Sequence, residues 1–297
     1  MGAKLRTVRR RIRGVQSTMK ITRAMELIAA SRIRRAQQRV EQARPYASRI
    51  TEVIQAVTSQ TEELEHSLLE DRPDPQAAAV LAVTSDRGLA GAYSSNVLRT
   101  TEELSQRLRS EGKEPKYYVT GRKGVSYLRF RQRPVQQRWT GFSEQPGYDQ
   151  AKEIADTMIQ AFLDGEVDEI HVVYTRFISG LTQRPEARRV VPLVVEETEE
   201  APPEPIPLYI FDPGPQEILA ALLPRYVETR VFAALVEAAA SEHAARRRAM
   251  SAATENAEDL IKVLTREANQ ARQTEITTEI MEIVGATEAL QQGAAAS

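Results

Sequence analysis

The sequence contains no cysteine, so disulfide bonds, thiolate nucleophiles and cysteine-based zinc sites are excluded. Its 3 histidines, His66, His171 and His243, lie far apart, which argues against a histidine-rich metal site; His171 falls in a strand pattern and is interpreted as structural. Aromatic residues make up 5% of the chain, fewer than a thick core normally uses. The longest strongly apolar run, Ala77–Val83, is far shorter than the roughly 20 residues of a membrane-spanning helix.

No apolar stretch of a signal peptide follows the basic start of the chain, so we expect a soluble, cytoplasmic protein. Although the net charge is only -1, residues 1–49 hold fourteen Lys and Arg side chains against two acidic ones, Glu26 and Glu41. Such a basic arm is typical of proteins that bind nucleic acid or an acidic membrane surface, and also of a solvated helix face that pairs with acidic protein. Nucleic acid is the weaker alternative, because the arm has almost no aromatic side chains to stack on bases.

Residues 3–58 are predicted to form one long helix. Apolar residues recur about every 3.5 positions, which makes a narrow seam suited to one partner helix. Pro45 is expected to kink this helix or to start a new one. Fourteen of sixteen seam positions are apolar, namely all of the following except Thr22 and Glu26: Leu5, Val8, Ile12, Val15, Met19, Thr22, Glu26, Ala29, Ile33, Ala36, Val40, Ala43, Ala47, Ile50, Ile54 and Val57.

Residues 75–212 are predicted to form a small α/β domain. Strands that alternate with helices favour a largely parallel, Rossmann-like sheet. An acidic, proline-rich loop is expected over Glu196–Pro207. The expected strands are Ala77–Thr84, Pro115–Thr120, Glu169–Phe177 and Arg188–Val195, and the expected helices are Ser94–Ser110 and Asp149–Leu163.

Residues 213–290 are predicted to form a second very long, alanine-rich helix, whose apolar stripe weakens at His243 and Arg247. Both terminal helices have an unpaired seam. The expected fold is therefore mixed: residues 1–60 and 213–290 pair as a long antiparallel coiled coil, and the α/β domain is inserted at one end. The second helix is longer by about 20 residues, or roughly 30 Å. Its overhang, Glu267–Leu290, shows no strong apolar stripe and no run of charge, so we expect it to be held by another protein or to be disordered.

No motif in the chain predicts catalysis, a metal or a cofactor. The P-loop, G-x-S-x-G and H-E-x-x-H patterns are absent, and no carboxylate pair stands out from the solvated faces. The loop Ser85–Asn96 carries two glycines ahead of a helix and could cradle a phosphate at the helix's amino end. The favoured alternative is a tight turn that needs both glycines, with Ser94 or Ser95 as the helix cap.

Several segments resemble the γ subunit of F-type ATP synthases and occur in the order of that family. Ile12–Gln37 (IRGVQSTMKITRAMELIAASRIRRAQ) resembles its amino-terminal helix, and Ala271–Glu282 (ARQTEITTEIME) carries its I-T-x-E-x-x-E signature. Thr84–Asn96 (TSDRGLAGAYSSN) is similar to a family loop through Asp86, Arg87, Gly88 and Gly91. Further matches are Arg44-Pro45-Tyr46, Arg225–Val231, Ser241–Ala245 and Met250–Ala257, whereas residues 112–205 match in pattern only.

The resemblance also has departures. Ala286-Thr287 stand where the family usually has Gly-Ala, and Ala90 stands where cysteine is common. Phe211 lacks the hydroxyl of the tyrosine expected there, and the cysteine-bearing insert of the plant plastid form is absent. These differences affect single contacts and not the resemblance as a whole.

The resemblance implies a rotor shaft without a catalytic site or cofactor of its own. In that family the paired terminal helices turn inside a ring of three α and three β subunits, and the α/β domain stands on the membrane c ring beside ε. Proton flow drives the rotation, and the asymmetric shaft switches the β sites that make or hydrolyse ATP. One copy per complex is expected, peripheral to the cytoplasmic face of a bacterial membrane.

By position, the residues that match the family's contacts with the α/β ring are Met25, Arg246, Gln273 and Thr277. Those that match its foot contacts with the c ring and ε are Tyr209, Phe211 and Asp212. Met25 is equally interpreted as filler of the seam, and Arg246 as part of a solvated arginine run. The basic arm is expected to meet acidic loops of the ring, giving the unequal contacts that switching requires. Two competing hypotheses are a coiled-coil nucleic-acid binder and a nucleotide-using enzyme built on the Asp86–Asn96 loop.

Overall fold

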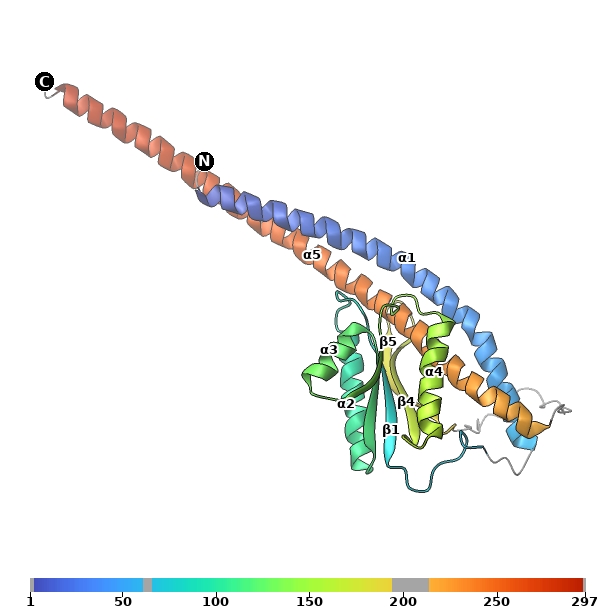
Figure 1. Ribbon diagram of the computed structural model, residues 1–297. Coiled ribbons are helices and arrows are strands. Elements are labelled where there is room, and N and C mark those ends of the chain that lie inside the picture. The colour runs from blue at the N-terminus through green and yellow to red at the C-terminus, as the bar shows by residue number, and fades with distance from the viewer. Residues whose placement is uncertain (1–2, 61–65, 194–213, 296–297) are drawn as a thin grey trace. The chain divides into compact units, whose positions relative to one another are not determined.

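The computed structural model describes residues 3–60, 66–193 and 214–295, and the chain divides into two units (Figure 1). One unit combines Met1–Ile28 with Arg248–Ser297, and the other is Ala29–Arg247. Two long helices, α1 (Ala3–Gln60) and α5 (Pro215–Ala295), each contribute to both units. The remaining elements are β1 (Ala77–Val83), α2 (Tyr93–Ser110), β2 (Glu114–Thr120), α3 (Arg122–Phe130), β3 (Val135–Trp139), α4 (Tyr148–Leu163), β4 (Glu169–Phe177) and β5 (Gln183–Val191).

The Ala29–Arg247 unit is built on a five-stranded sheet of order β3-β2-β1-β4-β5. Strand β1 pairs in parallel with β2 and β4, β2 pairs in parallel with β3, and only the β4–β5 pair is antiparallel. At the centre, Val80 lies opposite Tyr117 on one side and His171 on the other. The mixed fold with a largely parallel sheet, predicted from the alternation of apolar runs and helices, is confirmed.

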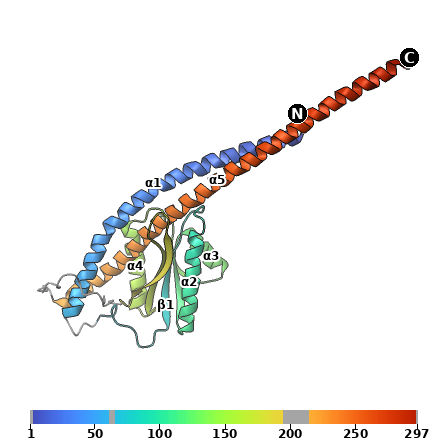
Figure 2. The same ribbon diagram turned by 180° about the vertical axis from the view of Figure 1, so that it is seen from behind.

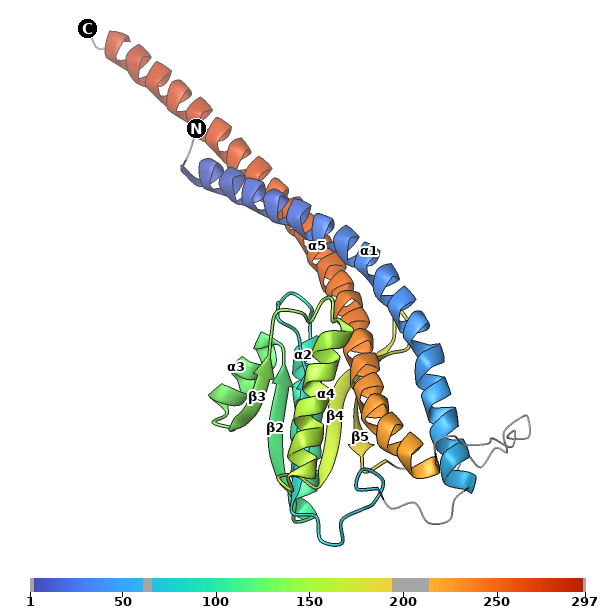
Figure 3. The same cartoon turned by 45° about the vertical axis from the view of Figure 1, so that its right-hand side comes forward.

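Both faces of the sheet are covered, which explains the continuous apolar sequence of β1. Ala78, Val80 and Ala82 belong to one core, which also contains residues of the helices α2 and α3. Figure 2 shows both helices on the same side of the sheet. Ala79 and Leu81 face the opposite core, to which α4 and parts of α1 and α5 contribute. Figure 3 shows α4 lying over this second face, along the direction of the strands.

Where the structure describes its side chains, the seam of α1 is buried or half-buried, as its spacing predicts. In the Ala29–Arg247 unit, Ile33 and Ala36 pack with Ala240 and Ala244 of α5, and Phe177 of β4 completes the cluster. Further along α1, the seam residues pack into the core of the sheet together with the first turns of α5. The residues from α1 are Ile50, Ile54 and Val57, and those from α5 are Leu219, Leu223 and Val227. Residue numbers rise along α1 as they fall along α5, so the two helices are antiparallel in this unit.

The Met1–Ile28 and Arg248–Ser297 unit is a pair of helices with a smaller core. Leu5 and Val8 of α1 cluster with Leu264 and Ala268 of α5. Nearer the other end of the pair, the hydroxyls of Thr22 and Thr254 lie 2.8 Å apart in a buried hydrogen bond. The pairing is again antiparallel, and a polar contact replaces an apolar one where the predicted seam has Thr22.

Of the two outcomes predicted at Pro45, the start of a new helix is excluded, because helix α1 continues through this residue as one element. Two other details of the predicted elements are wrong. Helix α3 and strand β3 were not predicted, because their sequences (RKGVSYLRF and VQQRW) are short and polar. Strand β5 begins at Gln183 and not at Arg188, because the first half of this edge strand is at most partly buried and carries no apolar signal.

The overhang of α5 beyond Ala271 differs from the prediction that it lacks an apolar stripe. Ile276, Ile280, Ile283 and Val284 follow the i, i+4, i+7, i+8 spacing of one helix face. They are 44%, 54%, 67% and 51% exposed. The segment is helical and presents an apolar face to its surroundings.

Replacing Phe162 tests the core that α4 forms with the sheet. Phe162 is fully buried, and the Arg72 guanidinium lies 4.8 Å from its ring centroid. Phe162→Ala is expected to lower the free energy of unfolding by about 3–5 kcal/mol. The adjacent Leu163 is 52% exposed, so Leu163→Ala is the matched control and is expected to change little. Denaturant titration followed by the fluorescence of Trp139, the single tryptophan, measures both; equal losses would contradict the assignment of this core.

Glu169 predicts how this unit responds to acid. Its carboxylate lies 2.8 Å from His171 Nε2 and 2.6 Å from Lys113 Nζ. The hydrogen bond from His171, followed by the contacts with Lys113, lowers the pKa of Glu169 from 4.5 to about 2. A lowered folded-state pKa stabilises the fold above the unfolded-state value, and this contribution is lost as the pH falls through the folded-state pKa. The difference in unfolding free energy between the native chain and Glu169→Gln should therefore shrink from pH 5 towards pH 2, and a pH-independent difference would contradict it.

Candidate functional site

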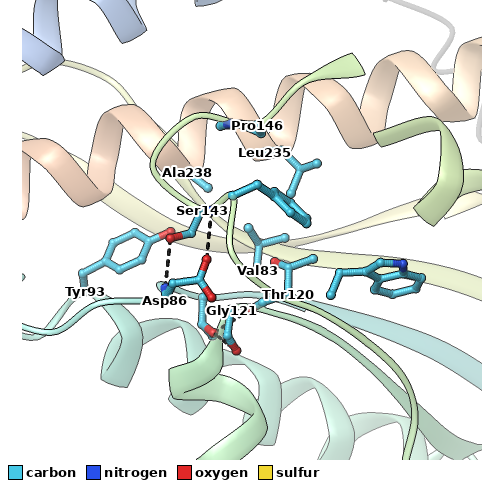
Figure 4. Close-up of a pocket in the computed structure, with 12 residues that line it drawn as sticks. Val83, Asp86, Tyr93, Thr120, Gly121, Ser143, Pro146, Leu235 and Ala238 are labelled. Carbon is cyan, nitrogen blue, oxygen red and sulfur yellow. Dashed lines mark hydrogen bonds between the residues drawn. The ribbon is translucent and has the colours of Figure 1, made fainter. Parts of the chain in front are cut away.

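The loops that follow β1, β2 and β3 meet at one edge of the sheet, because the three strands are parallel. This edge gathers the loop after Val83, the turn at Gly121 and the loop after Trp139, as Figure 4 shows. The loop after Val83 contains the four family-loop residues, Asp86, Arg87, Gly88 and Gly91.

Asp86 ties these three loops together. Its carboxylate accepts backbone hydrogen bonds from Arg122 at 3.2 Å, Gly141 at 2.8 Å and Ser143 at 3.1 Å. Its own backbone N–H donates to Ser143 Oγ at 2.9 Å, and Figure 4 shows Asp86 directed at this serine. One side chain thus replaces several backbone contacts that a loop edge would otherwise leave to water.

The edge of the sheet has no room for a phosphate beside Asp86. The cavity lined by Asp86, Tyr93, Gly121 and Ser143 measures about 10 Å³, the size needed for one water molecule. The backbone N–H groups of Arg122, Gly141 and Ser143 around Asp86 already bind its carboxylate. The interpretation of this loop as a turn therefore fits better than the phosphate cradle.

The prediction that the turn needs both glycines of its loop is wrong for Gly88, which has no positive φ and where a Cβ would meet only the Lys123 side chain at 3.6 Å. Gly91 has φ 56°, in the left-handed region that glycine favours. Gly121 has φ 87°, and a Cβ there would lie 2.2 Å from the carbonyl oxygen of Thr84. The predicted serine cap of α2 is wrong, because Ala92 occupies the cap position and Ser94 Oγ instead lies 2.7 Å from Ser85 Oγ.

A cluster of charged side chains joins this edge to both long helices within the Ala29–Arg247 unit; we call it the Glu144 junction. The Glu144 carboxylate pairs with Arg32 of α1, lies 3.2 Å from Arg246 Nη1 of α5, and lies 3.8 Å from Arg87 Nη1. The backbone carbonyl of Glu144 accepts a hydrogen bond from His243 Nε2 at 3.1 Å. The junction consists of Arg32, Arg87, Glu144, Glu242, His243 and Arg246.

Arg246 is the buried cation of the junction. It is 6% exposed, lies 2.6 Å from Glu242 Oε1, and donates to the carbonyl of Gly88 at 3.4 Å. Arg247 and Arg248 are exposed, so of the three consecutive arginines Arg246 alone is buried. The guanidinium thereby holds the family loop against α5.

Burial controls the protonation of the junction. It raises the pKa of Glu242, although Arg246 beside it acts in the opposite direction. It lowers the pKa of His243, which favours the neutral ring. Burial also raises the pKa of Tyr93, with Glu242 nearby acting in the same direction.

The other predicted contact residues are distributed as follows. Met25 is half-buried on α1, whereas Gln273 and Thr277 are exposed on α5, where Thr277 Oγ1 donates to the Gln273 carbonyl at 2.9 Å. Their roles as contacts with other subunits stay predictions, as does that of Arg246. Tyr209, Phe211 and Asp212 lie outside the described residues.

The sequence reasoning missed Glu144, Arg32, Glu242 and His243 as one constellation. Part of the signal was present, because Glu242 and Arg246 are four residues apart on a helix, the spacing of an ion pair. Arg32 and Glu144 are 112 residues apart, and no local pattern connects them. Within the described residues, no three His, Asp or Glu side chains are placed to hold a metal ion, and no helix there is long and apolar enough to cross a membrane.

Comparisons with known proteins place the chain among close relatives. Residues 4–290 match the protein family described as ATP synthase. The chain is 59% identical to the ATP synthase gamma chain of Frankia casuarinae over 99% of this chain and 100% of that one. It is 60% identical to the ATP synthase gamma chain of Acidothermus cellulolyticus over 98% of each. A chain in the Euglena gracilis mitochondrial ATP synthase structure of OSCP, F1 and c-ring shares its fold, with TM-score 0.68 and 18% identity over 99% of this chain and 96% of that one.

Replacing Glu144 tests the junction. Glu144→Gln removes the charge that faces three arginines and is expected to lower the free energy of unfolding by about 1–3 kcal/mol. The control is Asp156→Asn, which removes an exposed pair with Lys152 and is expected to cost at most about 0.5 kcal/mol. Hydrogen exchange at the amides of residues 141–147 should rise in Glu144→Gln and stay unchanged in the control. Unchanged exchange in both variants would contradict the junction.

Proposed function

The chain belongs to the family of ATP synthase γ chains, and from this premise we propose how it acts as the central rotor shaft of an F-type ATP synthase. It is a subunit without a catalytic site of its own, because the catalytic sites of that enzyme lie on the β subunits. Proton flow through the c ring turns the shaft, and the shaft switches the β sites that synthesise or hydrolyse ATP.

The observation that carries the proposal is the exposed apolar surface of the helix pair formed by residues 3–28 and 248–295. The pair buries its seam between α1 and α5, yet Ile21, Leu27 and Ile28 on α1 are 59%, 64% and 53% exposed. On α5, Leu260 and Val263 are 42% and 48% exposed, and the overhang adds its own stripe. Apolar surface of this extent marks contact with other protein, which supports a shaft enclosed by a ring.

The overhang of α5 suits a surface that must turn. The hydroxyls of Thr274, Thr277 and Thr278 donate to carbonyls one turn back at 2.9–3.0 Å, so they need no partner outside the helix. Apolar contact is non-directional, whereas a hydrogen bond favours one orientation. A tip that offers methyl groups and satisfied hydroxyls therefore presents low barriers between orientations. We propose Gln273 and Thr277 as ring contacts on this basis.

The Glu144 junction supports transfer of torque from the α/β domain to the helices. It links the loop after β3 with Arg32 of α1 and Arg246 of α5 inside one unit. Arg246 is engaged within the chain, so any contact it makes with a ring subunit would act together with this network. Met25, half-buried beside the seam, is proposed as a ring contact through its exposed part.

The basic arm supports contact with acidic loops of the ring. Arg34 and Arg35 are exposed, whereas Arg32 is tied to Glu144 and is not free for a partner. Charge reversal of Arg34 and Arg35 therefore tests this contact, and unchanged turnover and torque would refute it.

We further propose the assembly and location of the chain by analogy with its family. The partners are the α and β subunits of the hexamer, the ε subunit and the c ring, with one γ copy per complex at the cytoplasmic face of a bacterial plasma membrane. Residues 75–212 would act as the foot, with Tyr209, Phe211 and Asp212 at its contact with the c ring and ε. Residues 1–60 and 213–290 would form the shaft.

Of the competing hypotheses, a nucleotide-using enzyme is disfavoured because Asp86 occupies the backbone donors of its loop. A nucleic-acid binder predicts affinity for nucleic acid that falls steeply with salt. Recovery of α, β and ε with the tagged chain, without nucleic acid, distinguishes the shaft from both.

Rotation of the chain within its complex is the direct test. Because the chain contains no cysteine, Gln106→Cys on the exposed face of α2 offers a single attachment point for a bead. In a complex immobilised through the hexamer, the bead is expected to turn in one direction when ATP is supplied. A complex labelled on the hexamer itself is the control and should not turn. Hydrolysis without rotation of the bead on γ would contradict the proposal.

A further inference from the structure

Residues 115–143, which contain most of β2 and all of α3 and β3, carry charge of one sign only. They include seven Lys and Arg side chains and no Asp or Glu. Strand β3 is one edge of the sheet, and Figure 3 shows α3 beside it, on the side away from β5. We define the α3 patch as the following surface residues of α3, of the turn after it and of β3: Arg122, Lys123, Arg129, Phe130, Arg131, Arg133 and Arg138. All of them are exposed except Arg133, which is half-buried.

Helix α3 directs its basic side chains outward. Gly124 and Leu128 are its buried residues, about one turn apart, and Leu128 belongs to the core that α2 and the sheet share. Arg122 and Arg129 are about two turns apart, so they lie on one face of the helix, opposite to Leu128. The exposed face of α3 therefore carries positive charge along its whole length.

Few of these cations are neutralised within the chain. Arg133 lies 3.5 Å from Glu102 Oε2 of α2. Arg122 lies 4.0 Å from Asp86, whose carboxylate is already bound by backbone donors. Within the part of the chain that the structure describes, no ion pair is formed by the four other basic side chains of the α3 patch, namely Lys123, Arg129, Arg131 and Arg138. Their charge is available to a partner.

Phe130 places an apolar ring among these charges. It is the last residue of α3, is 83% exposed, and is flanked in sequence by Arg129 and Arg131. Cζ of Arg131 lies 5.6 Å from the centroid of the half-buried Tyr127 ring. Removal of a phenylalanine ring from water is favourable. A partner that fits this surface therefore offers both negative charge and an apolar environment.

We propose that the α3 patch binds the surface of an anionic lipid bilayer, with Arg129 and Arg131 at the lipid phosphates and the Phe130 ring between the headgroups. A guanidinium group matches the geometry of a phosphate. Apolar side chains flanked by basic ones bind at the boundary between headgroups and acyl chains without crossing the bilayer. Binding to lipid requires no other subunit, so this proposal stands or falls independently of the rotor function.

The composition of the α3 patch favours lipid over two other acidic partners. Single-stranded nucleic acid is bound by several aromatic rings that stack on successive bases, and Phe130 is the one exposed aromatic side chain of residues 115–143. An acidic protein would neutralise the arginines, but it needs a preformed pocket to bury an aromatic ring. An anionic bilayer supplies charge at its surface and an apolar interior directly below it, so it satisfies both parts of the patch.

An environment-sensitive fluorophore at position 130 tests the contact. Because the chain contains no cysteine, Phe130→Cys gives a single attachment point in the full-length chain. Vesicles of phosphatidylcholine and phosphatidylglycerol in equal parts are expected to shift the emission to the blue, and vesicles of phosphatidylcholine alone are not. Leu181→Cys is the matched control, because Leu181 is 85% exposed on the loop between β4 and β5, at the opposite edge of the sheet.

Removal of charge from the labelled chain tests the arginines. A basic side chain near an anionic bilayer strengthens binding by about fivefold. The triple variant Lys123→Gln, Arg129→Gln and Arg131→Gln should therefore raise the lipid concentration at half-maximal shift by roughly a hundredfold. The control of equal charge lies on the basic arm, where exposed side chains of α1 are changed in the triple variant Arg6→Gln, Arg10→Gln and Arg13→Gln. Its effect on the label at position 130 should be smaller.

A single-stranded oligonucleotide and poly-glutamate serve as competing probes. Neither has an apolar interior, so both are expected to leave the colour of the emission at position 130 unchanged. The proposal is overturned if anionic vesicles do not shift this label, if the label at position 181 shifts as far, or if either soluble polyanion produces the larger shift. It is also overturned if the change on the basic arm weakens the response more than the change in the α3 patch does.

Discussion

The structure depends on one constraint: a helix as long as α1 carries an apolar seam that it cannot bury by itself. The seam is met by α5 in both units, from Leu5 and Val8 against Leu264 and Ala268 to Ile33 and Ala36 against Ala240 and Ala244. Alanines on α5 allow close approach of the two backbones, which explains a helix so rich in a small residue. Because each helix is the other's partner, the ends of the chain must come together, and the α/β domain can only be an insertion between them.

The seam explains pairing but not how the inserted domain is fixed to the helices. Apolar contacts are non-directional, so they do not fix the orientation of the domain relative to the helices of its unit. The Glu144 junction fixes this orientation, because an ion pair between an arginine and a carboxylate has a defined geometry. Arg32 and Arg246 reach the same side chain from two helices, so movement of the loop after β3 strains both contacts. A shaft that transmits torque needs such contacts where force enters it, and a buried network resists rearrangement because any unpaired charge there is costly.

The helices and most strands could be predicted from the sequence because their signals are local. The 3.5-residue period gave the seam of α1, and apolar runs gave β1, β2 and β4. Strand β3 and the first half of β5 could not be found, since they are edge strands whose exposed residues carry no apolar pattern. Asp86 was recognised only as part of a motif, and Glu144 was not recognised at all. Their partners come from distant parts of the sequence, and a single sequence holds no record of which carboxylate meets which arginine.

The edge of the sheet shows why fold and function must be argued separately. The carboxyl ends of parallel strands commonly bind phosphates through free backbone N–H groups. Here the same kind of backbone donors, from Arg122, Gly141 and Ser143, bind the Asp86 carboxylate, and the cavity beside it holds about one water molecule. The Asp86 carboxylate thus occupies the position that an anionic ligand would take, and this edge of the sheet holds its three loops together and does not bind a ligand.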